Sequence, residues 1–206
     1  VTFDAKAESL GVNKAKKNWN SVGDHAPAYL INLYLATGDD NYAKFLEDTF
    51  DTICDHFPDY GYSPFMNEKF FDDWSRDLEW GIHQARCVVG HNLKVAWNLT
   101  RMHSLMPKES YKTFAHQIAD AIPGAGCDNQ RGGWYDMMER TLKDGEENYR
   151  RVWHDRKAWW QQEQGILAYY IMAGVYDDKP EYLNYAREGS AFYNGWFLDY
   201  EAGGIY

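Results

Sequence analysis

The sequence predicts an all-α fold built from repeated helical hairpins that stand side by side as an array or toroid. Three apolar stretches begin at residues 25, 91 and 161, at a nearly constant period of about 70 residues, and each has a helical pattern of about four turns. A polar turn and a second, amphipathic stretch follow each of them. Apolar residues make up 45% of the 206 residues and charged residues 25%, which is ordinary for a globular chain.

The elements follow one plan along the chain. Residues 1–20 are polar and rich in lysine, and we expect a surface segment at the amino end of a single domain over 1–206. The predicted helix pairs cover residues 25–38 with 41–57, 91–104 with 110–122, and 161–174 with 181–197. The first helix of each pair is mostly apolar and the second has one apolar face, as in an inner helix wrapped by an outer one. We expect short strands or hairpins in the Gly-rich, aromatic loops between the pairs.

Composition narrows the classes of ligand. The net charge of −10 argues against nucleic acid or an anionic membrane as the main partner, and no apolar run reaches the length of a membrane span. Cys54, Cys87 and Cys127 form neither a disulfide framework nor a zinc pattern, so we predict a reducing, cytoplasmic location. The histidine spacing supports no metal, and we predict no cofactor. Aromatic residues reach 17%, which is typical of a ring-binding cleft or of a Trp-rich core.

The predicted starts of the three inner helices carry matching polar residues: His25, His91 and Gln161. Unpaired backbone N–H groups and the positive end of the helix dipole disfavour an imidazolium there, so we expect a neutral ring that can act as a general base. Lys94 lies one turn after His91 and is expected to lower the pKa of His91 further, or to hold an anionic group. The alternatives are histidines that are only hydrogen-bonded at their helix ends, and a lysine on the outer side.

Two tryptophans stand next to each other at the start of the third pair. Neighbours on a helix lie about 100° apart, so Trp159 and Trp160 cannot both occupy the centre of one core stripe. Glu163 shares the face of Trp159, because the two are four residues apart. We expect one indole in the core or wedged against the next hairpin, and the other, beside Glu163, as a stacking platform. In the alternative, both are core residues and Glu163 accepts a hydrogen bond from the GGWYD loop.

Acidic residues outside these helices offer a further possibility, the carboxylate pair of a glycosidase. The candidates are Asp72, Asp73, Asp77, Glu146 and Glu147. A glycosidase needs two carboxyl groups facing each other across a bond. We interpret these residues instead as solvated loop charges.

Five stretches, taken together and in order, resemble the N-acylglucosamine 2-epimerase superfamily, which includes cellobiose 2-epimerases and aldose–ketose isomerases. They are GDHAPAYLINLYLATGDDNYA, FFDDW, GHNLKVAW, GGWYD followed by RKAWWQQEQ, and LDYEAGGIY. They cover nearly the whole chain, and the ordered set is more specific than any one of them. The resemblance implies an (α/α)6 barrel around a sugar pocket, of which this chain supplies about three helix pairs from the middle to the carboxy-terminal part.

The resemblance also implies a cofactor-free reaction on a mono- or disaccharide. A proton next to the carbonyl of the open-chain sugar leaves and returns to the other face or to the neighbouring carbon. His91 is implied as an acid/base, His25 as a histidine that contacts the substrate, and Glu163 as a supporting carboxylate. The implied or candidate substrate contacts are Trp159, Trp160, Lys94, Trp134 and Gln161.

The chain departs from the family pattern at two places. The family usually has Glu three residues after each of the two histidines, where this chain has Ala28 and Lys94, so we expect a divergent branch. The family's second catalytic histidine corresponds to a position beyond residue 206. We therefore expect the chain to need barrel helices from a longer chain or another subunit, and to be inactive alone. The alternatives are a non-catalytic carbohydrate-binding or scaffold domain and an (α/α)6 glycoside hydrolase.

Overall fold

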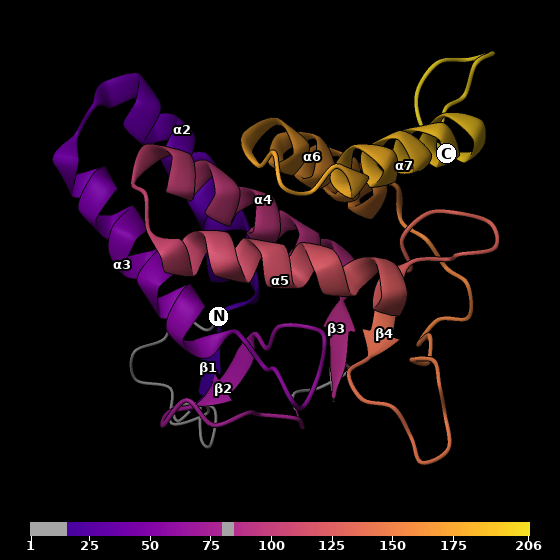
Figure 1. The fold of residues 1–206 in the computed structure, drawn as a ribbon, viewed down its shortest axis with the longest axis horizontal. Coiled ribbons are helices and arrows are strands. Elements are labelled where there is room, and N and C mark those ends of the chain that lie inside the picture. The colour runs from indigo at the N-terminus through magenta and orange to yellow at the C-terminus, as the bar shows by residue number, and fades with distance from the viewer. Residues whose placement is uncertain (1–15, 80–84) are drawn as a thin grey trace, which may run out of the picture.

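A computed structural model describes residues 16–79 and 85–206, so most of the predicted N-terminal segment lies outside the described residues. The all-α prediction is confirmed, with three helix pairs in the predicted places (Figure 1). The pairs are α2 (His25–Thr37) with α3 (Asp40–His56), α4 (Val89–Leu105) with α5 (Glu109–Gly126), and α6 (Trp159–Val175) with α7 (Glu181–Trp196). Within the described ranges, no helix combines the length and the apolar character that a bilayer crossing needs.

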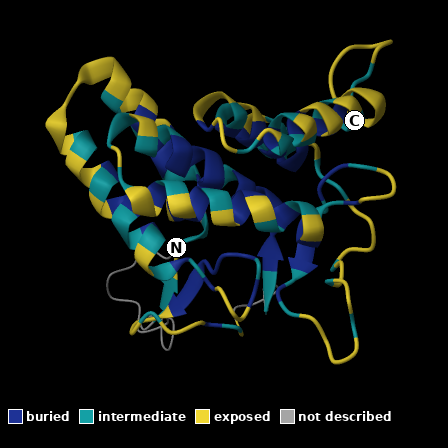
Figure 2. Cartoon of the chain, viewed as in Figure 1, coloured by how far each residue is buried: buried dark blue, intermediate teal, exposed yellow. Residues whose placement is uncertain are grey.

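The helix α4 lies at the centre of this arrangement. It packs against its own partner α5 and against α6, while α2 pairs with α3 and α6 with α7. From Leu93 to Thr100 every residue except Lys94 is buried. The two flanking inner helices are more open, and Figure 2 shows exposed residues along α2 and α6. Large exposed apolar side chains on these two helices are Tyr29, Leu33, Leu35, Trp159, Leu167, Tyr170 and Val175.

Local chemistry explains the sharp turn inside the first pair. Gly38 ends α2 with φ of 66°, a left-handed conformation that an L side chain rarely adopts. Asp39 follows and starts α3, because its side chain accepts a hydrogen bond from the backbone N–H of Asn41 at 2.9 Å. The apolar face of α3 then packs into the core through Leu46, Phe50 and Ile53.

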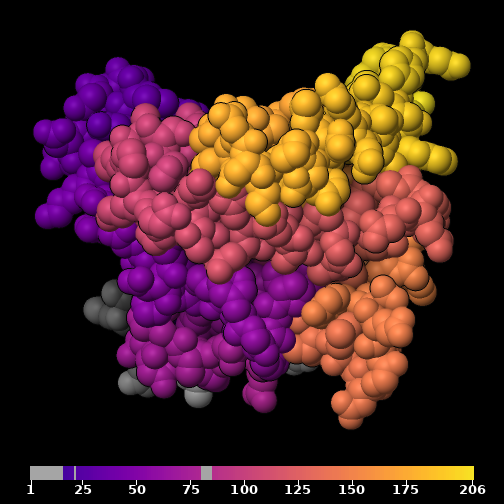
Figure 3. All heavy atoms as spheres, in the orientation of Figure 1, coloured from indigo at the N-terminus to yellow at the C-terminus, as the bar shows by residue number. Residues whose placement is uncertain are grey.

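Two small antiparallel sheets lie near the amino end of α4 (Figure 1); three of their strands are in the loops between helix pairs, as expected, and the fourth is in the predicted N-terminal surface segment. One pairs β1 (Lys16–Asn18) with β2 (Lys69–Phe71), and the other pairs β3 (Arg86–Val88) with β4 (Met137–Glu139). The strand β3 runs directly into α4, and a single turn, α1 (Asn20–Gly23), precedes α2. The loop between α5 and α6, which contains β4, projects from the helices at the lower right of Figure 3. These short elements set the positions of the side chains at the inner-helix starts.

Candidate active site

Two histidines and two carboxylates meet where α2 and α4 begin. The rings of His25 and His91 lie 6.3 Å apart, centroid to centroid, and nearly perpendicular at 85°. Nδ1 of His91 is 3.0 Å from one carboxylate oxygen of Glu68 and 3.1 Å from the other. Nδ1 of His25 is 2.5 Å from Oδ1 of Asp24, whose Oδ2 lies 3.7 Å from Nε2 of His91. Each imidazole therefore has a carboxylate on its Nδ1, and Asp24 approaches both rings.

Buried asparagines on α4 fix these carboxylates. Asn92 accepts a hydrogen bond from the backbone N–H of Met66 at 2.9 Å, which ties the segment ahead of Glu68 to the helix. Asn98 donates to the backbone oxygen of Asp24 at 3.0 Å, which ties the start of α2 to the same helix. Both asparagines are fully buried. Since a buried amide that loses its partner costs about 1–3 kcal/mol, these bonds specify one arrangement of the site.

The start of α4 is joined to the start of α6 by Gln161. The Gln161 side-chain oxygen accepts from the backbone N–H of Gly90 at 2.7 Å, and its amide nitrogen donates to the Asp136 carboxylate. The residue is fully buried, so both ends of its amide are used within the protein. Sequence reasoning placed Gln161 among the substrate contacts, whereas the structure gives it an internal role at a helix end.

The electrostatics of the site are those of a buried ion pair. Burial on its own lowers the pKa of His91, but the Glu68 carboxylate and, more weakly, Asp24 outweigh it and raise this pKa above its ordinary value of 6.5. Burial likewise raises the pKa of Glu68, but the facing imidazole of His91 outweighs it and the net shift is downward. Both shifts favour the charged forms.

The pKa of His91 shifts in the direction opposite to the one expected from its place at a helix start. Two backbone N–H groups at the start of α4 already have partners within the protein: Gly90 donates to the Gln161 side chain, and Val89 donates to the backbone oxygen of Asp136 at 3.3 Å. The ring therefore responds to Glu68 more than to the helix end. The lysine whose charge lowers the pKa of His91 is Lys69, and Lys94 interacts with Asp24. Lys94 is itself half-buried, with a pKa that burial lowers and Asp24 partly restores.

The two tryptophans lie in different surroundings, but neither of them is the core residue that one was expected to be. Trp160 is half-buried, with its ring 5.8 Å from that of His91. Trp159 is 45% exposed. Glu163 accepts a hydrogen bond from the hydroxyl of Tyr193 on α7 at 2.7 Å, so it faces the outer helix of its own pair. The structure thus brings Trp160 to the histidines and directs Glu163 toward α7.

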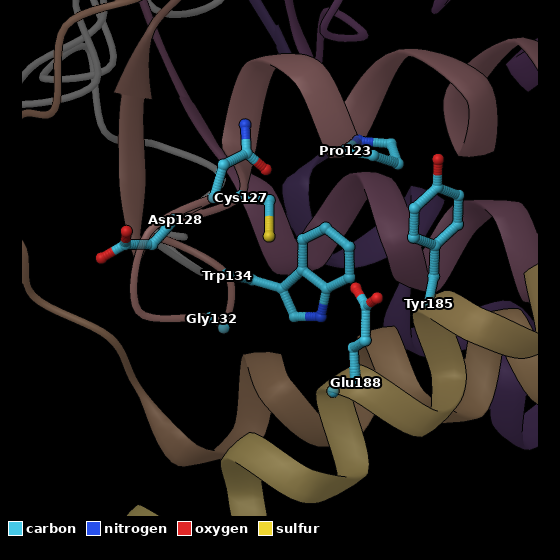
Figure 4. Close-up of a pocket in the computed structure, with 10 residues that line it drawn as sticks. Pro123, Cys127, Asp128, Gly132, Trp134, Tyr185 and Glu188 are labelled. Atoms are coloured by element: carbon cyan, nitrogen blue, oxygen red, sulfur yellow. The ribbon is translucent and has the colours of Figure 1, made fainter.

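Trp134, the remaining predicted contact, lines a cavity together with residues of α5 and α7, and does not lie at the histidines. It is 2% exposed and stacks on Tyr169 with centroids 5.5 Å apart. Its backbone N–H donates to the Gln162 side chain at 2.7 Å. Figure 4 shows the indole beside Tyr185 and Glu188 of α7, in a cavity of about 300 Å³. This cavity is lined by neither histidine.

The acids that were weighed as a glycosidase pair are mostly loop charges, as interpreted. Asp72 and Asp73 are exposed, and Glu146 pairs with Arg150. Asp77 is the exception, because it is 3% exposed and forms an ion pair with Lys16 at 2.6 Å. Over residues 16–79 and 85–206, no three His, Cys, Asp or Glu side chains converge in a way that could hold a metal ion.

Sequence reasoning missed Asp24 and Glu68. Asp24 directly precedes His25 in the quoted GDHAP stretch, so adjacency was an available signal. Glu68 is 23 residues from His91 along the chain, and only the fold brings them together. The sequence signal for Glu68 was weaker: Glu68 is an acid that directly precedes the KFF strand, which overlaps the FFDDW stretch.

The comparisons with known proteins agree with this fold. A model of the family described as N-acylglucosamine 2-epimerase (GlcNAc 2-epimerase) matches residues 3–206. No curated protein matches the chain.

Solved structures with the same fold include enzymes of different classes. A cellobiose 2-epimerase from Bacillus thermoamylovorans superposes with a TM-score of 0.70 at 16% identity, over 88% of this chain and 42% of that one. A D-mannose isomerase superposes with a TM-score of 0.69 at 21% identity, over 91% of this chain and 46% of that one. A glycoside hydrolase family 76 mannosidase from Bacteroides thetaiotaomicron superposes with a TM-score of 0.65 at 16% identity, over 84% of this chain and 44% of that one. The chain thus spans less than half the length of each.

Proposed function

Because this chain belongs to the N-acylglucosamine 2-epimerase family, we propose that it contributes His91 as one acid/base, and His25 as a substrate contact, to a cofactor-free carbohydrate epimerase or aldose–ketose isomerase. The observation that carries the proposal is the pair of imidazoles 6.3 Å apart, each with a carboxylate on its Nδ1. A carboxylate in that place orients the ring and leaves Nε2 as the edge that exchanges protons.

The chemistry needs a proton donor and a proton acceptor near one carbonyl group. Glu68 favours the protonated form of His91, which suits this ring to donate a proton to the carbonyl oxygen as the neighbouring C–H bond breaks. His25 contacts the substrate in this proposal, since its side chain is 45% exposed. Trp160, beside His91, offers the stacking surface for the sugar.

The other predicted residues support the site from further away. Gln161 holds the starts of α4 and α6 together, and Glu163 holds α6 against α7 through Tyr193. Lys94 lies close enough to Asp24 to interact with its charge. We retain Trp159 as a second candidate sugar contact because its ring is exposed. The substrate is a mono- or disaccharide, and the free cysteines favour a cytoplasmic location.

The test is solvent exchange into a panel of sugars. The longest natural polypeptide that contains this chain is incubated in D2O with aldoses, ketoses, N-acetylhexosamines and β-linked disaccharides, and proton NMR follows the signal at the carbon next to the carbonyl. We expect exchange with one sugar class, abolished by His91→Ala. Trp160→Ala should raise KM more than Trp159→Ala, its matched control, because only Trp160 adjoins His91.

Two other outcomes would favour the alternatives. Sugar binding without exchange, from a folded protein, would point to a binding domain. Release of reducing ends from a glycan would point to a glycoside hydrolase, a class that shares this fold. We also expect the 206-residue chain alone to be inactive, since the similar enzymes are about twice its length. Turnover by the chain alone would contradict that expectation.

A further inference from the structure

Lys94 is a half-buried cation on the inner helix α4 that has no partner of its own. Among residues 16–79 and 85–206, no hydrogen bond or close ion pair reaches its ammonium group. From Leu93 to Thr100 it is the one residue of α4 that is not buried. An ammonium group only donates hydrogen bonds, and withdrawing it from water without an acceptor is costly. Lys94 therefore calls for an acceptor that the described residues do not supply.

The side chain of Lys94 belongs to the face of α4 that meets the start of α2. His91, Lys94 and Asn98 are spaced three and four residues apart, so they share one side of the helix. Nε2 of His91 lies 3.7 Å from a carboxylate oxygen of Asp24, and Asn98 donates to the backbone oxygen of Asp24 at 3.0 Å. Lys94 thus lies between two residues that contact the same aspartate. The helical rise places it about 4.5 Å beyond His91 along the axis.

Asp24 is the carboxylate that acts on Lys94, but its two oxygens already serve the histidines. Oδ1 is 2.5 Å from Nδ1 of His25, and Oδ2 faces Nε2 of His91 at 3.7 Å. Burial lowers the pKa of Lys94, and Asp24 only partly restores it. Setting the charge of His91 does not account for Lys94 either, because the lysine that lowers the pKa of His91 is Lys69.

The site carries a net positive charge in a protein whose net charge is −10. The charged groups around the two rings are the carboxylates of Asp24 and Glu68, the ammonium groups of Lys69 and Lys94, and the His91 imidazolium that Glu68 favours. Three positive charges against two negative ones leave one positive charge. Two further ion pairs nearby, Arg140–Asp59 and Lys16–Asp77, are neutral in sum. A local positive charge in an acidic protein favours an anionic ligand at this place.

We propose that the substrate of this site is an acidic sugar, with a carboxylate or phosphate group that Lys94 holds. The inference rests on the proposed function for the reaction and adds the class of substrate to it. The sugar lies against Trp160 of α6 with its carbonyl group at His91. Its anionic substituent extends toward α2 and accepts hydrogen bonds from the ammonium group of Lys94.

Both departures from the family pattern agree with this assignment. Ala28 and Lys94 stand where the family usually has Glu. Two carboxylates that would repel an anion are therefore absent from the helix starts that frame the site, and a cation replaces one of them.

The first test compares the binding of matched sugars and needs no turnover. The longest natural polypeptide that contains this chain is titrated calorimetrically with glucose, mannose and galactose, with their uronates and with their 6-phosphates. We expect one acidic sugar to bind about 10–100 times more tightly than its neutral counterpart, as a hydrogen bond to a charged group commonly provides. The uronates and phosphates distinguish the two anionic groups. Equal affinities, or no binding of any acidic sugar, would overturn the proposal in the unmodified protein.

The second test removes the positive charge. Lys94→Met should reduce the affinity for the acidic sugar to that for its neutral counterpart, whose own affinity should change less than twofold. The unchanged binding of the neutral sugar also shows that the variant is folded. Lys44→Met removes the same charge from an exposed position on the outer helix α3 and should leave the preference intact. A preference that persists in Lys94→Met would refute the role of Lys94.

The third test separates this proposal from the proposed function. With an acidic sugar that exchanges in D2O, Lys94→Met should raise KM at least tenfold and change kcat much less, because Lys94 binds the substrate and breaks no bond. A fall in kcat with KM unchanged would contradict a binding role. If acidic sugars bind through Lys94 but none exchanges, the proposed function fails and this proposal stands. If neutral sugars alone exchange, the proposed function stands and this proposal fails.

Discussion

Replacing Glu68 by Gln should destabilise the protein more at about pH 6 than at about pH 9. Glu68 is 7% exposed and its carboxylate lies 3.0 Å from Nδ1 of His91. Glutamine keeps an acceptor of the same shape but removes the charge. A hydrogen bond to a charged group contributes about 1.5–3 kcal/mol and a neutral one about 1 kcal/mol. The expected loss near pH 6 is therefore about 1–2 kcal/mol.

The pH window follows from the direction of the two pKa shifts. The pKa of His91 is raised in the folded protein, so its stabilisation is complete below the unfolded value of 6.5 and disappears as pH rises through the folded pKa. The pKa of Glu68 is lowered, so its stabilisation is complete above 4.5 and disappears as pH falls through the folded pKa. The pair is at full strength between 4.5 and 6.5.

Urea unfolding measures the effect, with the free energy of unfolding compared between Glu68→Gln and the unmodified protein at both pH values. Glu201→Gln, at an exposed position, is the matched control. As pH rises through the raised pKa of His91, the imidazole loses its proton, so glutamine should be better tolerated at about pH 9 than at about pH 6. An equal loss at both pH values would refute the ion-pair reasoning and leave Glu68 with a packing role only.

Two further predictions concern the helix α6. Gly165→Ala should destabilise the protein by about 1–3 kcal/mol, because a Cβ there would lie 2.1 Å from Nε1 of Trp134. In Gly174→Ala, on the same helix, the added Cβ meets nothing within 4 Å, so this change should stabilise the protein by about 0.5–1 kcal/mol. Thermal unfolding compares the two variants, and equal melting temperatures would contradict the prediction. Gln161→Leu should lower the free energy of unfolding, measured with urea, by about 1–3 kcal/mol, because it leaves the buried N–H of Gly90 unpaired. An unchanged free energy of unfolding would mean that this hydrogen bond is not needed.

The positions of the six long helices could be predicted from sequence because they depend on local periodicity. An apolar stretch such as the one from His91 needs no knowledge of its neighbours to be recognised as an inner helix, and α4 is buried as expected. The same repeat pointed to His25 and His91, which the fold brings together. Helical geometry predicted that Trp159 and Trp160 face different ways, but it was the fold that placed Trp160 beside His91.

The charge state of the site was decided by the tertiary structure. The sequence indicated a histidine at a helix start, and from that position alone a neutral ring follows. Glu68 reverses that conclusion, because a loop and a short strand bring a carboxylate from 23 residues away onto Nδ1 of His91. Gln161 and Trp134 also belong to the quoted motifs, but the sequence did not reveal their surroundings. In the fold Gln161 joins the starts of two helices, and Trp134 is buried against Tyr169. Periodicity is a property of neighbours along the chain, whereas pKa and access to a ligand depend on groups that only folding brings within a few ångströms.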